Sequence, residues 1–362
     1  MQRYAILAIA TLFTAACSGG GTERGPTSSA SAAGTANTSS SAQLTGAGAT
    51  FPYPIYSKWF NEYASQTGVK INYQSIGSGG GIRQLSEQTV DFGASDAPMT
   101  DAELAKAKGG PILQFPTVLG AVVITYNAPQ LTHPLRLTGP LIADIFAGKV
   151  TKWNAPAIVA ANPGVALPST DILVAHRSDG SGTTYIFSSY LSAVSPSWKS
   201  SPGTGKELAW PVGLGGKGNE GVAGVVKQTP GAIGYVELAY AKENKLPYAS
   251  VQNASGAFVE PTIESVTADA RGVADTLSAS SDYRLSIVNA AGKDAYPISS
   301  MTWLLVYRHQ RDAAKGRALV DFMRWMYESA YKDAASLDYA PLPQKMRDAL
   351  IQRLTQIDVG GA

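Results

Sequence analysis

Residues 121–126 read Ala-Val-Val-Ile-Thr-Tyr, a continuous apolar run of strand length. Such a run is typical of a strand buried on both faces of a parallel sheet. The segments 171–175 (Asp-Ile-Leu-Val-Ala) and 300–307 (Ser-Met-Thr-Trp-Leu-Leu-Val-Tyr) follow the same pattern, and 69–73 (Val-Lys-Ile-Asn-Tyr) alternates polar and apolar residues. These four segments predict strands of a mostly parallel sheet.

Helix-like stretches lie between these strands. They are expected at residues 54–64, 82–88, 183–191, 221–227 and 315–331. Thr100 and Glu103 have the spacing of a capping box, which predicts a further helix over 101–108. The alternation of strands and helices indicates an α/β fold, and the length of the chain favours two lobes over one large sheet.

The composition excludes several classes of protein. Lys and Arg number 29 and Asp and Glu 27, so the net charge is 29 − 27 = +2, without the basic excess of a nucleic-acid binder. A single cysteine rules out an internal disulfide framework and a multi-thiolate metal site. The three histidines, at positions 133, 176 and 309, do not have the spacing of metal ligands, so we expect no metal and no cofactor.

The N-terminus has the features of an export signal. Arg3 precedes an apolar run, residues 4–13, that is too short to span a bilayer as a helix. The run leads to Cys17 through small residues, which resembles a bacterial lipobox and predicts a signal peptide over 1–16 and lipidation of Cys17. An ordinary secretory peptide with an incidental cysteine is the alternative. Residues 17–43 are rich in Ser, Gly, Thr and Ala and predict a flexible linker outside the cytoplasm.

Three glycine-rich turns are each followed by a helix-like stretch. They are Thr45–Phe51, Gly77–Gly81 and Arg177–Thr184. Each brings hydroxyl groups and backbone N–H groups to a helix N-terminus, where the first N–H groups lack partners and the helix dipole favours an anion. One such turn is usually a plain connection between a strand and a helix, but three in one chain predict an oxyanion site.

A fourth segment, Asp91–Pro98, places Asp96 just after a short apolar stretch. Taken alone, an aspartate there is usually a turn or capping residue. Asp96 is a candidate functional residue only because the same chain also contains the three glycine-rich turns.

Five stretches together resemble the periplasmic phosphate-binding protein of the bacterial phosphate-specific ABC importer. They are LTGAGATFPYPIYSKWF (44–60), IGSGGGIRQL (76–85), TVDFGASDAPMT (89–100), HRSDGSGTT (176–184) and GGKGNEGVAGVVKQTPGAIGYVE (215–237). The likeness runs from about Leu44 to Ile357, with the motifs in the family's order. It implies a receptor without catalytic residues, which works with two transmembrane permease subunits and an ATPase subunit.

The resemblance also implies a fold and a set of ligand residues. The fold is the two-lobed periplasmic-binding-protein fold (type II), with lobe I at 44–118 plus 297–362, lobe II at 119–296, and the ligand in a cleft between lobes joined by hinge strands. The phosphate-binding residues implied are Thr50, Phe51, Ser78, Asp96, Arg177, Asp179, Ser181, Gly182 and Thr183. A monomer anchored by lipid to a bacterial membrane, on its extracytoplasmic side, is expected.

Asp96 is the residue expected to distinguish phosphate from sulfate. Phosphate near neutral pH carries at least one proton, so a P–OH group can donate to a carboxylate. Sulfate has no proton to donate, and a buried carboxylate facing it would stay unpaired at a cost of a few kcal/mol. Arsenate carries equivalent protons and should be accepted.

Other functions remain open at this point. Ser181, His176 and Asp179 superficially offer a nucleophile, a base and an acid, but G-x-S-x-G is absent there, and triads usually gather distant segments. Residues 213–218 match G-x-G-x-x-G, although no clear buried strand precedes them, which favours a loop before a helix. A receptor for sulfate, arsenate or molybdate, a phosphatase-type hydrolase, and a surface adhesin are the alternative functions.

Overall fold

A computed structural model describes residues 42–131, 133–271 and 282–360 of the chain. The expected signal peptide, Cys17 and almost all of the linker lie outside the described residues. Within those ranges, no helix is both long and apolar enough to cross a membrane.

Most of the strands belong to one mixed sheet. Its order is β2-β1-β3-β11-β4-β8-β6-β7, with β12 also paired to β4, and the smaller sheet has the order β10-β9-β5. The strands are β1 (Gln43–Gly48), β2 (Lys70–Ser75), β3 (Phe92–Ser95), β4 (Ile112–Tyr126), β5 (Arg136–Leu137), β6 (Leu173–Arg177), β7 (Leu214–Gly216), β8 (Ala232–Glu237), β9 (Ser250–Gln252), β10 (Phe258–Val259), β11 (Ser299–Tyr307) and β12 (Ala340–Pro341).

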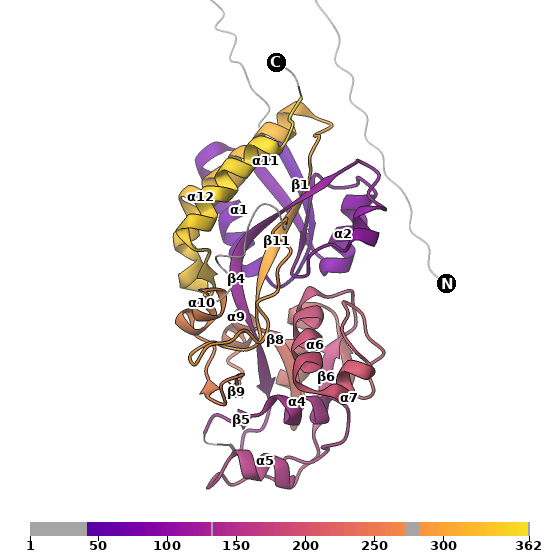
Figure 1. The fold of residues 1–362 in the computed structure, drawn as a ribbon, viewed down its shortest axis with the longest axis vertical. Coiled ribbons are helices and arrows are strands. Elements are labelled where there is room, and N and C mark those ends of the chain that lie inside the picture. The colour runs from indigo at the N-terminus through magenta and orange to yellow at the C-terminus, as the bar shows by residue number, and fades with distance from the viewer. Residues whose placement is uncertain (1–41, 132, 272–281, 361–362) are drawn as a thin grey trace, which may run out of the picture. The chain divides into compact units, whose positions relative to one another are not determined.

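Helices connect and flank these strands (Figure 1). They are α1 (Tyr53–Thr67), α2 (Ser78–Ser86), α3 (Asp101–Leu104), α4 (Gly139–Phe146), α5 (Pro156–Ala161), α6 (Gly182–Val194), α7 (Pro196–Ser200), α8 (Gly218–Gln228), α9 (Leu238–Glu243), α10 (Ile263–Arg271), α11 (Ala313–Glu328) and α12 (Gln344–Arg353), with 3₁₀ helices η2 (Ala330–Leu337) and η3 (Leu354–Gln356). The prediction of an α/β fold is confirmed.

The direction of the central strand corrects one prediction. Strand β4 is buried along almost its whole length, as its apolar run predicts, but it pairs antiparallel with β11, β8 and β12. Within this sheet, parallel pairing is confined to β1 with β2 and β3, and to β6 with β7 and β8; in the smaller sheet, β5 and β9 are also parallel. An apolar run reports burial on both faces and carries no information on strand direction, which explains the error.

Strand β4 changes its partner part of the way along its length. Residues up to Ala121 pair with β11, whereas Val122 to Tyr126 pair with β8. Figure 1 shows β4 and β11 between the part of the fold that contains β1, α1 and α2 and the part that contains β6, α6 and α7. This pair of strands therefore joins two α/β halves within residues 42–360.

Each half has its own aromatic core. Phe60 packs against Tyr73 and Phe322 in the first half, with ring centroids 5.8 and 5.4 Å apart. In the second half Phe187 stacks on Tyr235 at 4.3 Å. The strands and helices that carry the glycine-rich turns are anchored in these cores.

Several element boundaries differ from the sequence-based expectation. The capping box of Thr100 and Glu103 is present, but α3 ends at Leu104 instead of continuing to residue 108, where two glycines follow. Helix α8 begins at Gly218 instead of residue 221, and the stretch expected to be a loop before it contains the short strand β7.

Candidate functional site

Four helices begin close to one another at the ends of the strands. Thr50 and Phe51 lead into α1, Ser78 begins α2, Gly182 begins α6 and Gly218 begins α8. The N–H of Gly182 donates to the Ser78 hydroxyl at 3.1 Å. Helix N-termini carry partial positive charge and N–H groups without intrahelical partners, so their convergence forms a region suited to an anion.

Ser78 is a hydrogen-bonding centre of this region. Its Oγ accepts from the backbone N–H of Asp96 at 3.2 Å as well as from Gly182, and it lies 3.5 Å from Asp96 Oδ2. Its predecessor Gly77 has φ of 84°, and a Cβ there would lie 2.2 Å from Asp179 Oδ2. Only glycine permits both this backbone conformation and the close approach of the Gly77–Gly81 turn to the Arg177–Thr184 turn.

Arg177 and Asp179 form a bidentate ion pair within the Arg177–Thr184 turn. Arg177 donates from Nε and Nη2 to the two carboxylate oxygens of Asp179 at 2.7 and 2.6 Å, and from Nη1 to Thr183 Oγ1 at 3.3 Å. Asp179 Oδ1 also accepts from the N–H of Gly218 at 3.1 Å. Burial by itself lowers the pKa of Arg177, but the hydrogen bonds and charge of Asp179 outweigh it, so the guanidinium stays charged.

Asp96 is a buried carboxyl group with little exposed surface. It accepts from Thr302 Oγ1 at 2.9 Å. Burial raises the pKa of Asp96 to about 7, although the hydrogen bond from Thr302 and the charge of Arg177 oppose that shift. Asp96 therefore gains or loses its proton close to neutral pH, and it does so among groups that can donate hydrogen bonds to an anion.

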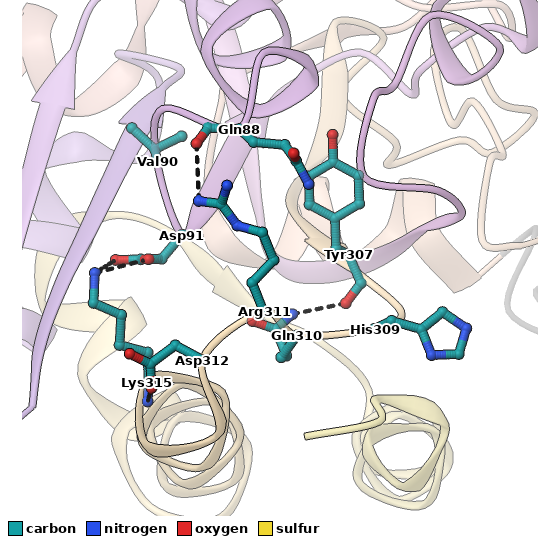
Figure 2. Close-up of a pocket in the computed structure, with 9 residues that line it drawn as sticks. All are labelled: Gln88, Val90, Asp91, Tyr307, His309, Gln310, Arg311, Asp312 and Lys315. Atoms are coloured by element: carbon teal, nitrogen blue, oxygen red, sulfur yellow. Dashed lines mark hydrogen bonds and ion pairs between the residues drawn. The ribbon is translucent and has the colours of Figure 1, made fainter. Parts of the chain in front are cut away.

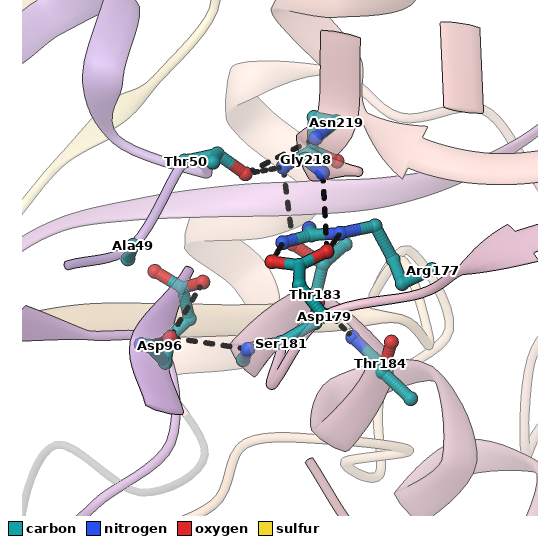
Figure 3. Close-up of polar contacts among 12 residues, drawn as sticks. Ala49, Thr50, Asp96, Arg177, Asp179, Ser181, Thr183, Thr184, Gly218 and Asn219 are labelled. Atoms are coloured by element: carbon teal, nitrogen blue, oxygen red, sulfur yellow. Dashed lines mark hydrogen bonds and ion pairs between the residues drawn. The ribbon is translucent and has the colours of Figure 1, made fainter. Parts of the chain in front are cut away.

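Asn219 lies in the centre of the site and was missed by the sequence analysis. Its Nδ2 donates to Thr50 Oγ1 at 2.8 Å and to Thr183 Oγ1 at 3.1 Å, and its backbone N–H also donates to Thr50 Oγ1 (Figure 3). Its Oδ1 accepts from the backbone N–H of Glu237 at 3.0 Å. Its place next to Gly218, within the fifth stretch quoted above, was the available signal.

The remaining predicted residues also lie at these helix starts. Ser181 is the N-cap of α6, and its Oγ accepts from the N–H of Thr184 at 3.0 Å. Gly182 fits closely, because a Cβ there would lie 2.5 Å from Ser78 Oγ and 2.6 Å from Asp96 Oδ2. The Phe51 side chain is buried against the ring of Tyr339. The structure thus brings together the four turns that carry all nine predicted residues.

The groups considered as a nucleophilic triad have other partners. The His176 ring stacks on Trp210 with centroids 4.8 Å apart, and its Nδ1 lies 3.0 Å from the carbonyl of Arg177. Asp179 is engaged by Arg177, and Ser181 caps its helix. These contacts align neither a base with Ser181 nor an acid with His176. Among the described residues, no group of three or more His, Cys, Asp or Glu side chains is placed to hold a metal.

A surface pocket lies elsewhere, between the end of β11 and the start of α11 (Figure 2). Its charged groups are engaged with neighbours: Lys315 pairs with Asp91 at 3.0 Å, and Arg311 donates to the carbonyl of Gln88. Tyr307 forms part of its wall. The pocket contains none of the nine predicted residues.

Comparison with known proteins identifies similar chains over most of this sequence. A family model described as the PBP superfamily domain matches residues 32–330. A phosphate-binding protein PstS of Xylella fastidiosa (strain Temecula1) is 51% identical over 307 residues, which cover 84% of this chain and 83% of that relative. A phosphate-binding protein PstS of Pasteurella multocida (strain Pm70) is 46% identical over 304 residues, or 84% of this chain and 87% of that relative.

A solved structure supports the fold. The phosphate-bound, high-affinity periplasmic phosphate-binding protein called PfluDING superposes with a TM-score of 0.67 at 20% identity, covering 85% of this chain and 92% of that chain. Such a likeness at low identity is evidence for the fold alone. Together with the family match, it confirms the two-lobed periplasmic-binding-protein fold.

Proposed function

Because this chain belongs to the PstS family of phosphate-binding proteins within the PBP superfamily, we propose that it binds inorganic phosphate outside the cytoplasm and delivers it to an ABC-type import permease. The observation that carries the proposal is the position of Asp96, a buried carboxyl group that contacts Ser78 where α2 and α6 begin. An acid in that place suits a ligand that is both an anion and a proton donor.

The proposed ligand contacts divide into donors and one acceptor. The donors face the unprotonated oxygens of phosphate. They are the side chains of Thr50, Ser78, Arg177, Ser181 and Thr183, and the N–H groups at the helix starts, including those of Phe51 and Gly182. Asp179 holds Arg177 by two hydrogen bonds and offsets part of its charge. Asp96 accepts from the P–OH group of the ligand.

This division predicts the order of preference among oxyanions. Phosphate and arsenate both carry a proton for Asp96, whereas sulfate leaves that carboxylate unpaired. Sites that hydrogen-bond a particular ligand hydroxyl reject an analogue without it by about 10⁴–10⁵-fold. Receptors for sulfate or molybdate are therefore the less favoured alternatives.

The proposed lobes are residues 44–118 with 297–362, and residues 119–296. The exchange of partners along β4 near Ala121 supports the boundary. Thr50, Ser78 and Asp96 then belong to lobe I, and Arg177 to Thr183 belong to lobe II. Ligand binding draws the lobes together by hinge closure, and two permease subunits with their ATPase subunit recognise the closed form.

The N-terminal part of the proposal concerns anchoring. Cys17 is proposed to carry the lipid that tethers a monomeric receptor to the outer side of a bacterial membrane, with residues 17–43 as its linker. Mass spectrometry of the N-terminal peptide from membranes tests this directly. An acyl modification on Cys17 is expected, and recovery of an unmodified, soluble chain after signal cleavage contradicts it.

Titration calorimetry tests the receptor function. The protein is refolded to strip bound ligand and titrated with phosphate and with sulfate at neutral pH. Tight binding of phosphate without heat from sulfate is expected. If neither anion binds and a chromogenic phosphomonoester is hydrolysed, the chain is a phosphatase-type hydrolase, the alternative that the contacts of His176 and Ser181 disfavour.

A further inference from the structure

Glu237 is a fully buried carboxyl group at the point where β4 changes its partner. It is the last residue of β8, and it pairs with Val122, the first residue of β4 in the ladder with β8. A buried carboxyl group at such a junction is costly to maintain unless its hydrogen bonds serve the structure around it.

The backbone and the side chain of Glu237 are each linked to the turn formed by Thr50 and Phe51. Its backbone N–H donates to Asn219, and Asn219 donates to Thr50 Oγ1. Its side-chain Oε2 lies 3.0 Å from the hydroxyl of Tyr339, and that hydroxyl donates to the carbonyl oxygen of Phe51 at 2.6 Å. One residue therefore reaches two consecutive residues of the first binding turn through two different intermediaries.

The proton count at Tyr339 determines the state of the carboxyl group. The hydroxyl has one proton and lies against two oxygens, and the carbonyl of Phe51 has no proton to offer. The shorter contact, at 2.6 Å, takes the tyrosine proton. With that proton engaged, the 3.0 Å contact between Tyr339 and Glu237 Oε2 is a hydrogen bond only if the carboxyl group carries a proton of its own, and that same oxygen still accepts from the N–H of Ala239 at 2.9 Å.

Burial of Glu237 favours this neutral form. It raises the pKa of Glu237 well above its usual range, although the hydrogen bonds with the N–H of Ala239 and with Tyr339 oppose the shift; the nearby acids Asp338 and Glu243 add smaller increases. Asp338 precedes Tyr339 and is paired with Lys242 of α9, the helix that also carries Glu243 and Tyr240. From α8, the neutral Asn219 contacts the backbone of Glu237.

We propose that Glu237 is a positioning residue of the binding site, a neutral carboxylic acid that donates to Tyr339 and so fixes the Thr50–Phe51 turn. This inference rests on the proposed phosphate-binding function. Glu237 does not touch the ligand in this proposal. It acts through Tyr339, which holds the carbonyl of Phe51 and so the backbone of the turn, and through Asn219, which holds the hydroxyl of Thr50 proposed to face the phosphate.

Phosphate affinity of two tyrosine variants tests the relay. Tyr339→Phe removes the link between Glu237 and Phe51, and Tyr327→Phe is a matched control, because Tyr327 is another buried tyrosine whose hydroxyl donates to a backbone carbonyl at 2.6 Å, that of Pro116. Both variants should lose thermal stability, but only Tyr339→Phe should lose phosphate affinity, on the order of tenfold. Equal affinity of Tyr339→Phe and wild type overturns the proposal.

A double-mutant cycle separates positioning from general stability. If Glu237 acts through Tyr339, the affinity losses of Glu237→Gln and Tyr339→Phe are coupled, and the double variant binds phosphate about as weakly as Tyr339→Phe alone. Additive losses contradict the relay. If the wild-type protein itself binds no phosphate, the proposed phosphate-binding function is what fails.

Infrared spectroscopy tests the proton without any ligand. Near neutral pH, wild type should show the C=O stretch of a protonated carboxyl group that is missing in Glu237→Gln. The band should shift in Tyr339→Phe, which lacks the acceptor, and stay in place in Tyr327→Phe. If the folded variants show that no such band belongs to Glu237, the residue is ionised and the proposal is wrong.

Discussion

Asn219 donates from its side-chain amide to the hydroxyl of Thr50 at 2.8 Å, although the two residues are 169 positions apart in the chain. The same amide nitrogen donates to Thr183. In the proposed division into lobes, Thr50 belongs to the first lobe, and Asn219 and Thr183 belong to the second. Asn219 thus connects hydroxyl groups that are proposed to face the phosphate from opposite sides.

Replacing Asn219 by alanine should weaken phosphate binding by about tenfold. The change removes three hydrogen bonds between buried groups: those donated to Thr50 and Thr183 and the one accepted from the N–H of Glu237. The hydroxyl groups of Thr50 and Thr183 are then free to rotate away from the ligand. Asn162→Ala is the matched control, because Asn162 is also buried and its amide bonds the carbonyls of Arg136 and Ile158 at 2.9 Å, away from the site. Calorimetric titration should show lower stability for both variants but unchanged affinity for Asn162→Ala; equal affinities for the two would refute a role for Asn219.

Gly182→Ala should abolish tight phosphate binding. The added Cβ would meet Ser78 Oγ at 2.5 Å and Asp96 Oδ2 at 2.6 Å, so the Arg177–Thr184 turn would have to move away from the turns that carry Ser78 and Asp96. Gly224→Ala in α8 is the control, since a Cβ there meets nothing within 4 Å and alanine stabilises a helix interior by about 1 kcal/mol. Phosphate-induced shifts in melting temperature compare the two, and a normal shift in Gly182→Ala would show that the close fit is not needed.

The stability of ligand-free protein should depend on the proton of Asp96. Burial raises its pKa from 3.8 to about 7. Between these values the native state holds a proton that the unfolded chain has lost, so the free energy of unfolding falls as the pH rises from about 4 to about 7. The decrease is up to about 4 kcal/mol, and it is complete above the folded pKa.

The Asp96→Asn variant isolates that contribution. It lacks the proton equilibrium while keeping a similar shape, so the difference in unfolding free energy between wild type and variant should change through this pH window. Urea unfolding in phosphate-free buffer measures it. A difference that is constant from pH 4 to pH 7 is inconsistent with a raised pKa for Asp96.

An ion pair between Glu103 and Lys206 should help to hold the lobes closed. The two groups are 2.7 Å apart, and their side chains are only 25% and 16% exposed. Lys206→Ala should weaken phosphate binding by about two- to fivefold, with the loss shrinking at high salt. Lys152→Ala, which breaks the exposed pair with Asp171, should leave binding unchanged; an identical effect in both variants would mean that closure does not involve Lys206.

The local features of the site were predictable from the sequence. Glycine and hydroxyl residues ahead of an apolar helical pattern identify the start of α6 to within one residue, because capping and anion binding depend on a few neighbouring residues. Helix α2 was expected from residue 82 but begins at Ser78, within its glycine-rich turn. The buried strands at 121–126 and 300–307 were also predictable, because a continuous apolar run is a local pattern of burial. Their antiparallel direction was not, since it depends on how distant segments pair.

The residues that the sequence analysis missed act over long distances. Asn219, Thr302 and Tyr339 contact the predicted site residues from segments far away in the chain. Tyr235 likewise meets the backbone N–H of Arg177 with its hydroxyl. Apart from the place of Asn219 beside Gly218, no sequence pattern separates such a role of these residues from ordinary packing, so the fold is what reveals their contacts.

The most direct test of the central claim is the anion preference of wild type and Asp96→Asn, measured by titration calorimetry with phosphate, arsenate and sulfate at neutral pH. Wild type should bind phosphate and arsenate tightly and give no heat with sulfate, and Asp96→Asn should gain sulfate binding, because an amide can donate to an unprotonated oxygen. Tight sulfate binding by wild type, or a variant with the same preference as wild type, would contradict the assignment of Asp96 as the acceptor of a ligand proton.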